Sequence, residues 1–386
     1  MGRRMRRNFR IALLCAFNSA KMILRELINA LETFAPLSLQ ESYDNSGLIY
    51  GNPEHEVESA LLSLDCTEAV IDEAIDKGCK LVISHHPIIF SGLKKITGKS
   101  YVERTIIKAI QSGTAIYAIH TNLDNVYNGV NGKICEKLGL EKTRILQPMS
   151  GKLKKIVVFV PHAHAENVRK TMFEAGAGYI GQYDECSFNT SGEGTFRPLS
   201  GSNPFVGEQG KRQLESEIRI EMIVESWKLN SVLAAMQVAH PYEEVAFDVL
   251  ALENEQKDIG MGMIGEFKDP MGIPAFLDML KREMKVPVVK YTQTSGEMIR
   301  KVAVCGGSGS FLTSRALAVG ADAFVTSDIK YHEFFDGEGR LLIADIGHFE
   351  SEQYTSEILN DFLAKKFPTF ATHFSAVRTN PVHYFL

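Results

Sequence analysis

The sequence predicts an α/β fold that is interrupted by a smaller α+β segment. In both end regions of the chain, apolar runs of strand length alternate with segments of helical apolar spacing, which is typical of a largely parallel sheet covered on both faces. From Lys154 to about Glu253 the expected order is instead βαββαβ, the pattern of a ferredoxin-like split unit. The composition, 45% hydrophobic and 23% charged over 386 residues, is that of a protein with a packed core.

The first alternating region opens at Met22 with a helix-patterned segment, MILRELINALETFAP. The helical segments that follow end at glycines, as expected for consecutive strand–helix units. We expect strands at 59–65, 81–84 and 114–120, with helices at 67–78 and 103–113. The second alternating region continues the pattern, with strands at 302–305, 323–328 and 341–347 and helices at 311–320 and 350–367.

The middle region has a different order, with a hairpin rich in glycine, serine and proline at 191–210. Its expected elements are strands at 155–160, 183–190, 216–224 and 243–252 and helices at 165–176 and 230–240. Because neither flank alone has enough strands for a full sheet, we favour an insertion over three consecutive domains, which remain the alternative. The predicted segments are an N-terminal extension at 1–21, the two halves of the α/β domain at 22–150 and 260–386, and the inserted domain at 151–259.

Residues 1–21 join a basic stretch, MGRRMRRNFR, to a short apolar run. This is the pattern of a secretory signal. The favoured interpretation is a leader that lies outside the fold, because Met22 opens a well-patterned helix.

Charge, hydropathy and cysteine spacing exclude several classes of protein. The formal net charge is −5, from 42 Lys and Arg against 47 Asp and Glu, so nucleic acid is not an expected partner. No run reaches the roughly 18 apolar residues that span a bilayer, so we expect no membrane partner. The six cysteines lie far apart without a CxxC pair, which disfavours a disulfide framework or thiolate cluster and favours a cytoplasmic location.

Polar side chains follow three of the expected strands at their carboxyl ends, where ligands bind in open α/β sheets. The first group is SHHP, which places His85 and His86 after the strand at 81–84. Because Pro87 favours an extended backbone before it, the two imidazoles can diverge toward two neighbouring metal ions. The alternative is a hydrogen-bonded loop.

The other two groups add carboxylates. Asp124 lies in HTNLD after the strand at 114–120, where the alternative is an ordinary turn. In GHFESE, His348 and Glu352 are four residues apart and share one face of a helical turn, although a surface pair is the alternative. Glu350 points elsewhere and suits the positive end of the helix dipole.

Together these side chains predict a metal centre at one edge of a single sheet. Nitrogen and oxygen ligands without thiolates suit zinc, manganese, iron or nickel. Because one catalytic zinc ion uses about three protein ligands, five ligands indicate two divalent ions per subunit. The predicted ligands are His85, His86, Asp124, His348 and Glu352.

These motifs, with DNSGL upstream and IGEF at 264–267, resemble the Nif-three-like family, often catalogued as GTP cyclohydrolase I type 2 homologues. The resemblance covers nearly the whole chain from Met22. It implies a dinuclear metal centre on the five ligands with Glu352 bridging, a toroidal homohexamer, and a middle insertion like the PII or divalent-ion-tolerance fold. One departure is Tyr43, where many members have Trp.

The expected function is a metal-dependent hydrolase of a phosphorylated or nucleotide-like substrate, with an activated water as nucleophile. The candidate proton carriers are His120 and His332, for which packed core histidines are the alternative. The family label suggests opening of the guanine ring of GTP, although no residue selects guanine. The alternative function is a non-catalytic metal-binding oligomeric scaffold or metal-trafficking protein with a ligand-sensing insertion.

A glycine-rich stretch, GGSGS at 306–310, joins a strand to a helix. Its backbone N–H groups could cradle an anion at the helix N-terminus. The stretch lacks the lysine of a P-loop, so a tight turn that allows close backbone packing is favoured.

Overall fold

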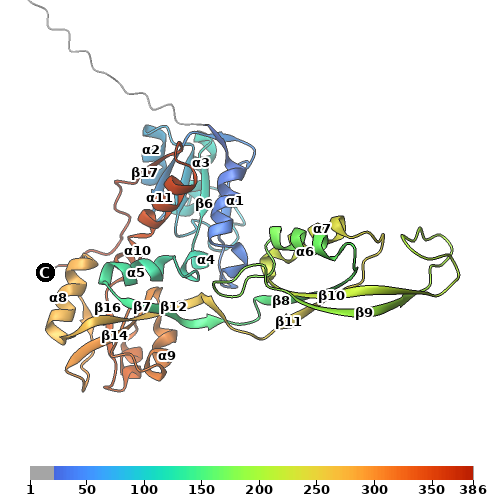
Figure 1. Ribbon diagram of the computed structural model, residues 1–386. Coiled ribbons are helices and arrows are strands. Elements are labelled where there is room, and N and C mark those ends of the chain that lie inside the picture. The colour runs from blue at the N-terminus through green and yellow to red at the C-terminus, as the bar shows by residue number, and fades with distance from the viewer. Residues whose placement is uncertain (1–20, 386) are drawn as a thin grey trace, which may run out of the picture. The chain divides into compact units, whose positions relative to one another are not determined.

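The computed structural model describes residues 21–385, so the expectation for the N-terminal extension falls almost entirely outside the described residues. The described chain forms two compact units (Figure 1). The first unit contains the residues up to Thr121 and those from Gln353 onward, and the second contains Asn122–Glu352. No helix in the described part of the chain combines the length and apolar character needed to cross a membrane.

The first unit is built on a five-stranded sheet in the order β17-β4-β5-β6-β2. Its three central strands are parallel and buried along their whole length, as their apolar sequences predict. These strands are β4 (Ser59–Ser63), β5 (Leu81–Ser84) and β6 (Ala115–Ala118). β17 (Ala371–Phe374) adds parallel to β4, and β2 (Gly47–Tyr50) adds antiparallel to β6.

Two helices of this unit, α2 and α3, begin where the sequence provides a capping side chain. The hydroxyl of Thr67 accepts a hydrogen bond from the N–H of Val70 at the start of α2 (Glu68–Asp76). Ser100 caps α3 (Tyr101–Ser112) in the same way, and Gly113 ends it in the left-handed conformation. The remaining elements are β1 (Met22–Ile23), α1 (Leu24–Phe34), η1 (Leu37–Leu39), β3 (Glu56–Val57), α4 (Thr121–Asp124) and α11 (Thr355–Lys366).

The second unit contains a six-stranded sheet in the order β13-β16-β15-β14-β12-β7. Its parallel part consists of β14 (Met298–Ser308), β15 (Ala323–Ser327) and β16 (Leu342–Asp345). The antiparallel strands are β7 (Glu141–Met149), β12 (Gln256–Gly272) and β13 (Lys290–Tyr291). The helices are α5 (Val130–Leu138), α8 (Ile273–Glu283), η3 (Ser310–Leu312), α9 (Thr313–Ala318), η4 (Tyr331–Gly337) and α10 (His348–Glu352).

A separate four-stranded antiparallel sheet lies within the same unit, in the order β11-β8-β10-β9. With its two helices, which pack on one face, it follows the predicted βαββαβ order (Figure 1). This order is compatible with a ferredoxin-like split unit, whose proposed boundaries at 151–259 stay a prediction. The elements are β8 (Leu153–Pro161), α6 (Ala165–Glu174), β9 (Phe188–Phe196), β10 (Gln213–Glu225), η2 (Ser226–Lys228), α7 (Leu229–Ala239) and β11 (Phe247–Leu252).

The α/β class is confirmed, but three sequence-based expectations are wrong in detail. The main parallel strands of the two alternating regions lie in two sheets, because β4, β5 and β6 pair with one another, whereas β14, β15 and β16 form part of a second sheet. The helix expected at 350–367 is divided into α10 and α11. The strand expected at 183–190 lies instead at Phe188–Phe196. Its pairing with β10 uses only backbone N–H and carbonyl groups, so the strand can continue into the glycine-rich stretch.

The chain's C-terminal segment is fastened to α2 through the half-buried Glu73. Its carboxylate accepts hydrogen bonds from the Ser375 hydroxyl at 2.5 Å and the Ala376 N–H at 2.9 Å, and it pairs with Lys77 at 2.8 Å. Burial opposes the charge, but these hydrogen bonds outweigh it and lower the pKa of Glu73 to about 2. Glu73 therefore contributes its full stabilisation above pH 4.5, and this is lost as the pH falls toward 2.

We expect Glu73→Gln to lower the free energy of unfolding at pH 7 by about 1–3 kcal/mol, because charged hydrogen bonds are lost. The difference from the parent protein should shrink as the pH falls below 4.5. Urea denaturation at pH 7 and pH 4 measures both effects. Asp76→Asn, on the same helix, is the control, and a difference that is constant with pH would contradict the expectation.

Candidate metal site

Three histidines gather at the carboxyl ends of adjacent strands in the first unit. His85 and His86 directly follow β5, and His120 lies two residues beyond β6. The three ring centroids are 5.0–5.3 Å apart, and each residue offers a ligating nitrogen within 4.8 Å of the others. His85 is fully buried, whereas His86 and His120 are half-buried. Because strands β5 and β6 are parallel neighbours, the topology itself brings these side chains to one edge.

Each of these imidazoles is oriented by a partner at Nδ1. His85 donates to the Ile119 carbonyl at 2.8 Å, and His86 and His120 each contact an aspartate oxygen at 2.7 Å. A carbonyl or an ionised carboxylate only accepts, so each Nδ1 carries a proton, and in the neutral imidazole the lone pair is then on Nε2. This is the arrangement of metal-binding histidines, whose second nitrogen is usually held by an oxygen.

The two aspartates, Asp65 and Asp44, are fixed in turn by hydrogen bonds from threonines. Asp65 accepts a hydrogen bond from the Thr379 hydroxyl through its second oxygen. Asp44 accepts from the Thr121 hydroxyl and from the Thr121 N–H at 3.0 Å. Burial opposes its charge, but the hydrogen bonds from His120 and Thr121 outweigh it and hold the pKa of Asp44 well below its usual range. Sequence reasoning had not assigned these orienting roles, although Asp44 lies in DNSGL and Asp65 ends an expected strand.

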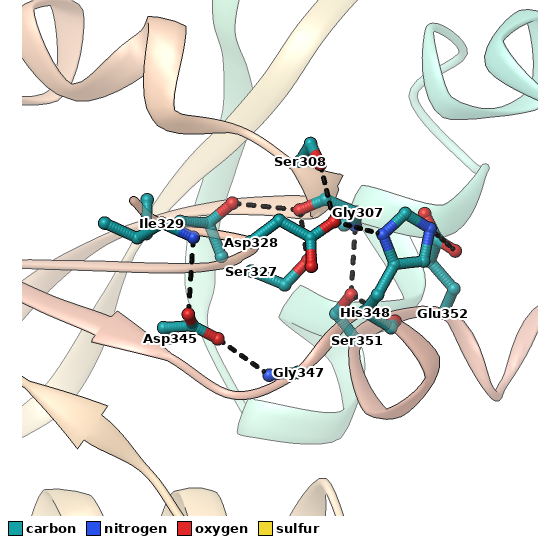
Figure 2. Close-up of polar contacts among 12 residues, drawn as sticks. Gly307, Ser308, Ser327, Asp328, Ile329, Asp345, Gly347, His348, Ser351 and Glu352 are labelled. Atoms are coloured by element: carbon teal, nitrogen blue, oxygen red, sulfur yellow. Dashed lines mark hydrogen bonds and ion pairs between the residues drawn. The ribbon is translucent and has the colours of Figure 1, made fainter. Parts of the chain in front are cut away.

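The second unit carries a histidine–carboxylate group on α10. His348 Nε2 lies 3.1 Å from Glu352 Oε2, which confirms the predicted shared helix face (Figure 2). The Nδ1 of His348 donates to Asp328 at 2.6 Å, and Asp328 also accepts from the Ser308 hydroxyl at 2.6 Å. Asp328 adopts a left-handed backbone with φ of 56°, a conformation that costs about 1–3 kcal/mol in a residue other than glycine.

The electrostatics of this group favour a positive charge. Burial opposes protonation of His348, but Asp328 and Glu352 outweigh it and raise its pKa to about 11. The Asp124 and Glu352 carboxylates offer oxygens within 4.8 Å of each other, so a cation there would relieve their repulsion. Burial, and then these two carboxylates, raise the pKa of the Cys305 thiol far above its usual range. Cys305 therefore stays protonated in the absence of a cation.

The glycine-rich stretch packs closely against Glu352. Gly307 has φ of +62°, and a Cβ there would lie 2.4 Å from Glu352 Oε1. Its N–H donates to the Ser351 hydroxyl at 2.9 Å, and its carbonyl accepts from the Ser327 hydroxyl at 2.6 Å (Figure 2). The close approach supports the expected close backbone packing, but β14 continues through Gly306 and Gly307 to Ser308, so the expected turn is confined to the end of the stretch.

Gly307→Ala tests that packing. We expect a loss of about 1 kcal/mol of stability from the left-handed backbone, and additionally a lower metal content because Glu352 must move. Denaturation and elemental analysis after dialysis measure the two effects. Gly320→Ala is a matched control, with φ of +70° and no atom within 4 Å of the added Cβ. Equal metal content in both variants would contradict the expectation.

Of the remaining predicted site residues, Glu350 lies in the first turn of α10 as expected and is buried. Asp124 ends α4, where its backbone carbonyl accepts from the Asn131 amide at 3.0 Å. His332 is exposed on η4, with its ring 5.2 Å from that of Tyr331. Its predicted role as a proton carrier stays a prediction, whereas His120 lies beside His85 and His86.

The donor set of the described residues fits a divalent metal. Four histidines have Nδ1 held by an oxygen, and Glu352 is only 2% exposed. Imidazole nitrogens and carboxylate oxygens without a thiolate suit borderline divalent metals. Buried His and Glu side chains of this chain could therefore hold a metal ion.

Known proteins match this chain over nearly its full length. The family model described as Duf34/NIF3 (NGG1p interacting factor 3) matches residues 22–381. A protein of Halalkalibacterium halodurans named "GTP cyclohydrolase 1 type 2 homolog" is 41% identical over 92% of this chain and 97% of its own length. A Bacillus subtilis protein of the same name is 37% identical over 89% and 91%. The crystal structure of a Bacillus cereus protein related to NIF3 has a TM-score of 0.82 and 37% identity, covering 94% of this chain and 99% of that one.

Proposed function

Because this chain belongs to the Duf34/NIF3 family, we propose that it is a dinuclear metal-dependent hydrolase of a phosphorylated or nucleotide-like substrate. The proposed ligands of two divalent ions are His85, His86, Asp124, His348 and Glu352. Zinc, manganese, iron and nickel all suit this set. The proposal includes a homohexamer, as the family resemblance implies, and a cytoplasmic location, which the cysteine spacing favours.

The observation that carries the proposal is the common orientation of the histidines. All three proposed imidazole ligands have Nδ1 engaged by an oxygen, at distances of 2.6–2.8 Å. A metal-binding histidine needs a free lone pair on Nε2, and a hydrogen bond from Nδ1 to an oxygen keeps it there. A histidine packed in a core has no such requirement. Two carboxylates within 4.8 Å of each other supply the negative charge that divalent ions require.

The chain's own groups would then divide the chemistry. When bound, the two ions supply Lewis acidity and lower the pKa of water for attack on the substrate. Asp65 and Asp328 keep His86 and His348 in the ligating tautomer. His120 would accept and then release a proton at Nε2, because Asp44 holds the other ring proton at Nδ1.

The substrate class rests on two supports. The relatives carry the name "GTP cyclohydrolase 1 type 2 homolog", which points to a nucleotide. Hydrolysis of phosphoesters and cyclic amides is also the chemistry that paired metal ions catalyse by clamping the attacking and leaving oxygens.

Metal removal and restoration test the proposal. We expect elemental analysis of the purified protein to find about two divalent ions per chain. We also expect hydrolysis of at least one compound in a panel of GTP, other nucleotides, phosphodiesters and cyclic amides. Chelation with EDTA should abolish turnover, and each candidate metal should be tested for its restoration. Full metal loading without turnover would instead identify the scaffold alternative.

A further inference from the structure

A cavity of about 670 Å³ lies on the four-stranded sheet of the second unit. Phe159 on β8 and Glu217 on β10 line it, whereas the adjacent residues Val158 and Ile218 pack in the core with α6 and α7. Since side chains alternate along a strand, the cavity occupies the sheet face opposite the two helices. Its volume is in the range of small-molecule sites, about 300–1,000 Å³.

Aromatic rings form one wall of this cavity. The ring of Tyr242 lies 6.0 Å from that of Phe196 and 6.2 Å from that of Phe205, measured between centroids. Phe205 is 54% exposed, although it is large and apolar. The faces of such rings carry partial negative charge, so a group of them attracts cations.

A buried carboxylate lies beside the rings. Glu217 is only 9% exposed, and its Oε1 accepts a hydrogen bond from the Tyr242 hydroxyl at 3.1 Å. Gly194 on the paired strand provides the room, because a Cβ there would lie 2.3 Å from Glu217 Oε2. Burial, and then Glu217, raise the pKa of Tyr242, which keeps its hydroxyl protonated as the donor.

The charge of the lining selects the sign of the ligand. Four carboxylates line the cavity against two guanidinium groups, those of Arg197 and Arg219. Arg219 is already paired with Glu221 at 3.0 Å. The excess of negative charge disfavours phosphate or carboxylate ligands and favours cations.

We propose that this cavity binds an organic cation, an ammonium group with apolar substituents, between the aromatic rings and the Glu217 carboxylate. The rings attract the charge and cover its apolar substituents. Glu217, which is only 9% exposed, compensates the charge. The site is separate from the proposed metal ligands and does not depend on the proposed hydrolase activity.

Two probes of nearly equal shape and different charge test the proposal on the full-length protein. Choline carries the ammonium group, and 3,3-dimethylbutan-1-ol is its neutral analogue. By isothermal titration calorimetry we expect choline to bind with a dissociation constant of about 1 mM or lower, and the alcohol at least about tenfold more weakly. Equal binding of both probes, or no binding of choline, would overturn the proposal without any variant.

Variants then locate the binding. Glu217→Gln, which keeps the shape and removes the charge, should weaken choline binding about tenfold or more, and Phe205→Ala about two- to thirtyfold. Glu208→Gln, an exposed carboxylate of the adjoining loop paired with Lys211, should bind as the parent protein does. Circular dichroism checks that each variant is folded. Choline binding that survives in both folded cavity variants would also overturn the proposal.

Discussion

Glu352→Gln is expected to weaken metal binding by more than about 100-fold, the upper end of what loss of an outer partner costs. The substitution keeps the size of a side chain that is only 2% exposed, but it removes the negative charge. That charge lies 3.1 Å from the His348 nitrogen and within 4.8 Å of the Asp124 carboxylate. Elemental analysis after dialysis, with competition against a chromophoric chelator, measures the affinity. Turnover should fall in parallel if the proposed hydrolase activity is correct.

Glu350→Gln is the matched control for this variant. Glu350 belongs to the same helix, α10, and is equally buried, at 2% exposure. Loss of stability from altering a buried carboxylate should therefore be similar in the two variants, whereas loss of metal should be confined to Glu352→Gln. A variant at Glu352 that binds metal as tightly as the parent protein would remove Glu352 from the proposed ligands.

Asp65→Asn is expected to weaken metal affinity by about 10- to 100-fold without removing any ligand. Its Oδ1 lies 2.7 Å from His86 Nδ1 and fixes which ring nitrogen carries the proton. An asparagine can present its NH₂ group there, which would favour the tautomer with the lone pair on Nδ1 and turn the proton of Nε2 toward the metal. Titration of the metal-free variant with Zn²⁺ measures the change.

Thr379→Val provides a graded test of the same arrangement. It removes only the hydroxyl that donates to the second oxygen of Asp65, so we expect a loss of less than about tenfold. Asp72→Asn, which alters an exposed ion pair with Lys108, should leave the affinity unchanged. Equal affinities of Asp65→Asn and Asp72→Asn would show that Asp65 does not orient His86.

Much of the fold and some of the site could be predicted from short-range patterns. Nearly continuous apolar runs identify β4, β5 and β6, because strands buried on both faces have few polar positions. The spacing of His348 and Glu352 places them on one face of α10, because neighbouring helical turns bring together residues four positions apart. Both predictions depend on geometry that a few consecutive residues determine.

The sheets could not be assigned in the same way. An apolar run indicates burial but does not identify the neighbouring strand, so one shared sheet was expected where two occur. β17 completes the N-terminal sheet although it lies near the chain's end, and it pairs with β4. The break between α10 and α11 was also missed, because helical spacing continues through it.

By itself the sequence determined the α/β class, the βαββαβ order of the middle segment and the histidines that end strands. Only the tertiary structure decided which oxygen orients each imidazole, because these partners are remote in the chain. Thr379 reaches Asp65 across 314 positions, and Asp44 reaches His120 across 76. A hydrogen bond depends on the distance and angle between two atoms in space, and local periodicity carries no information about either when the atoms belong to distant segments.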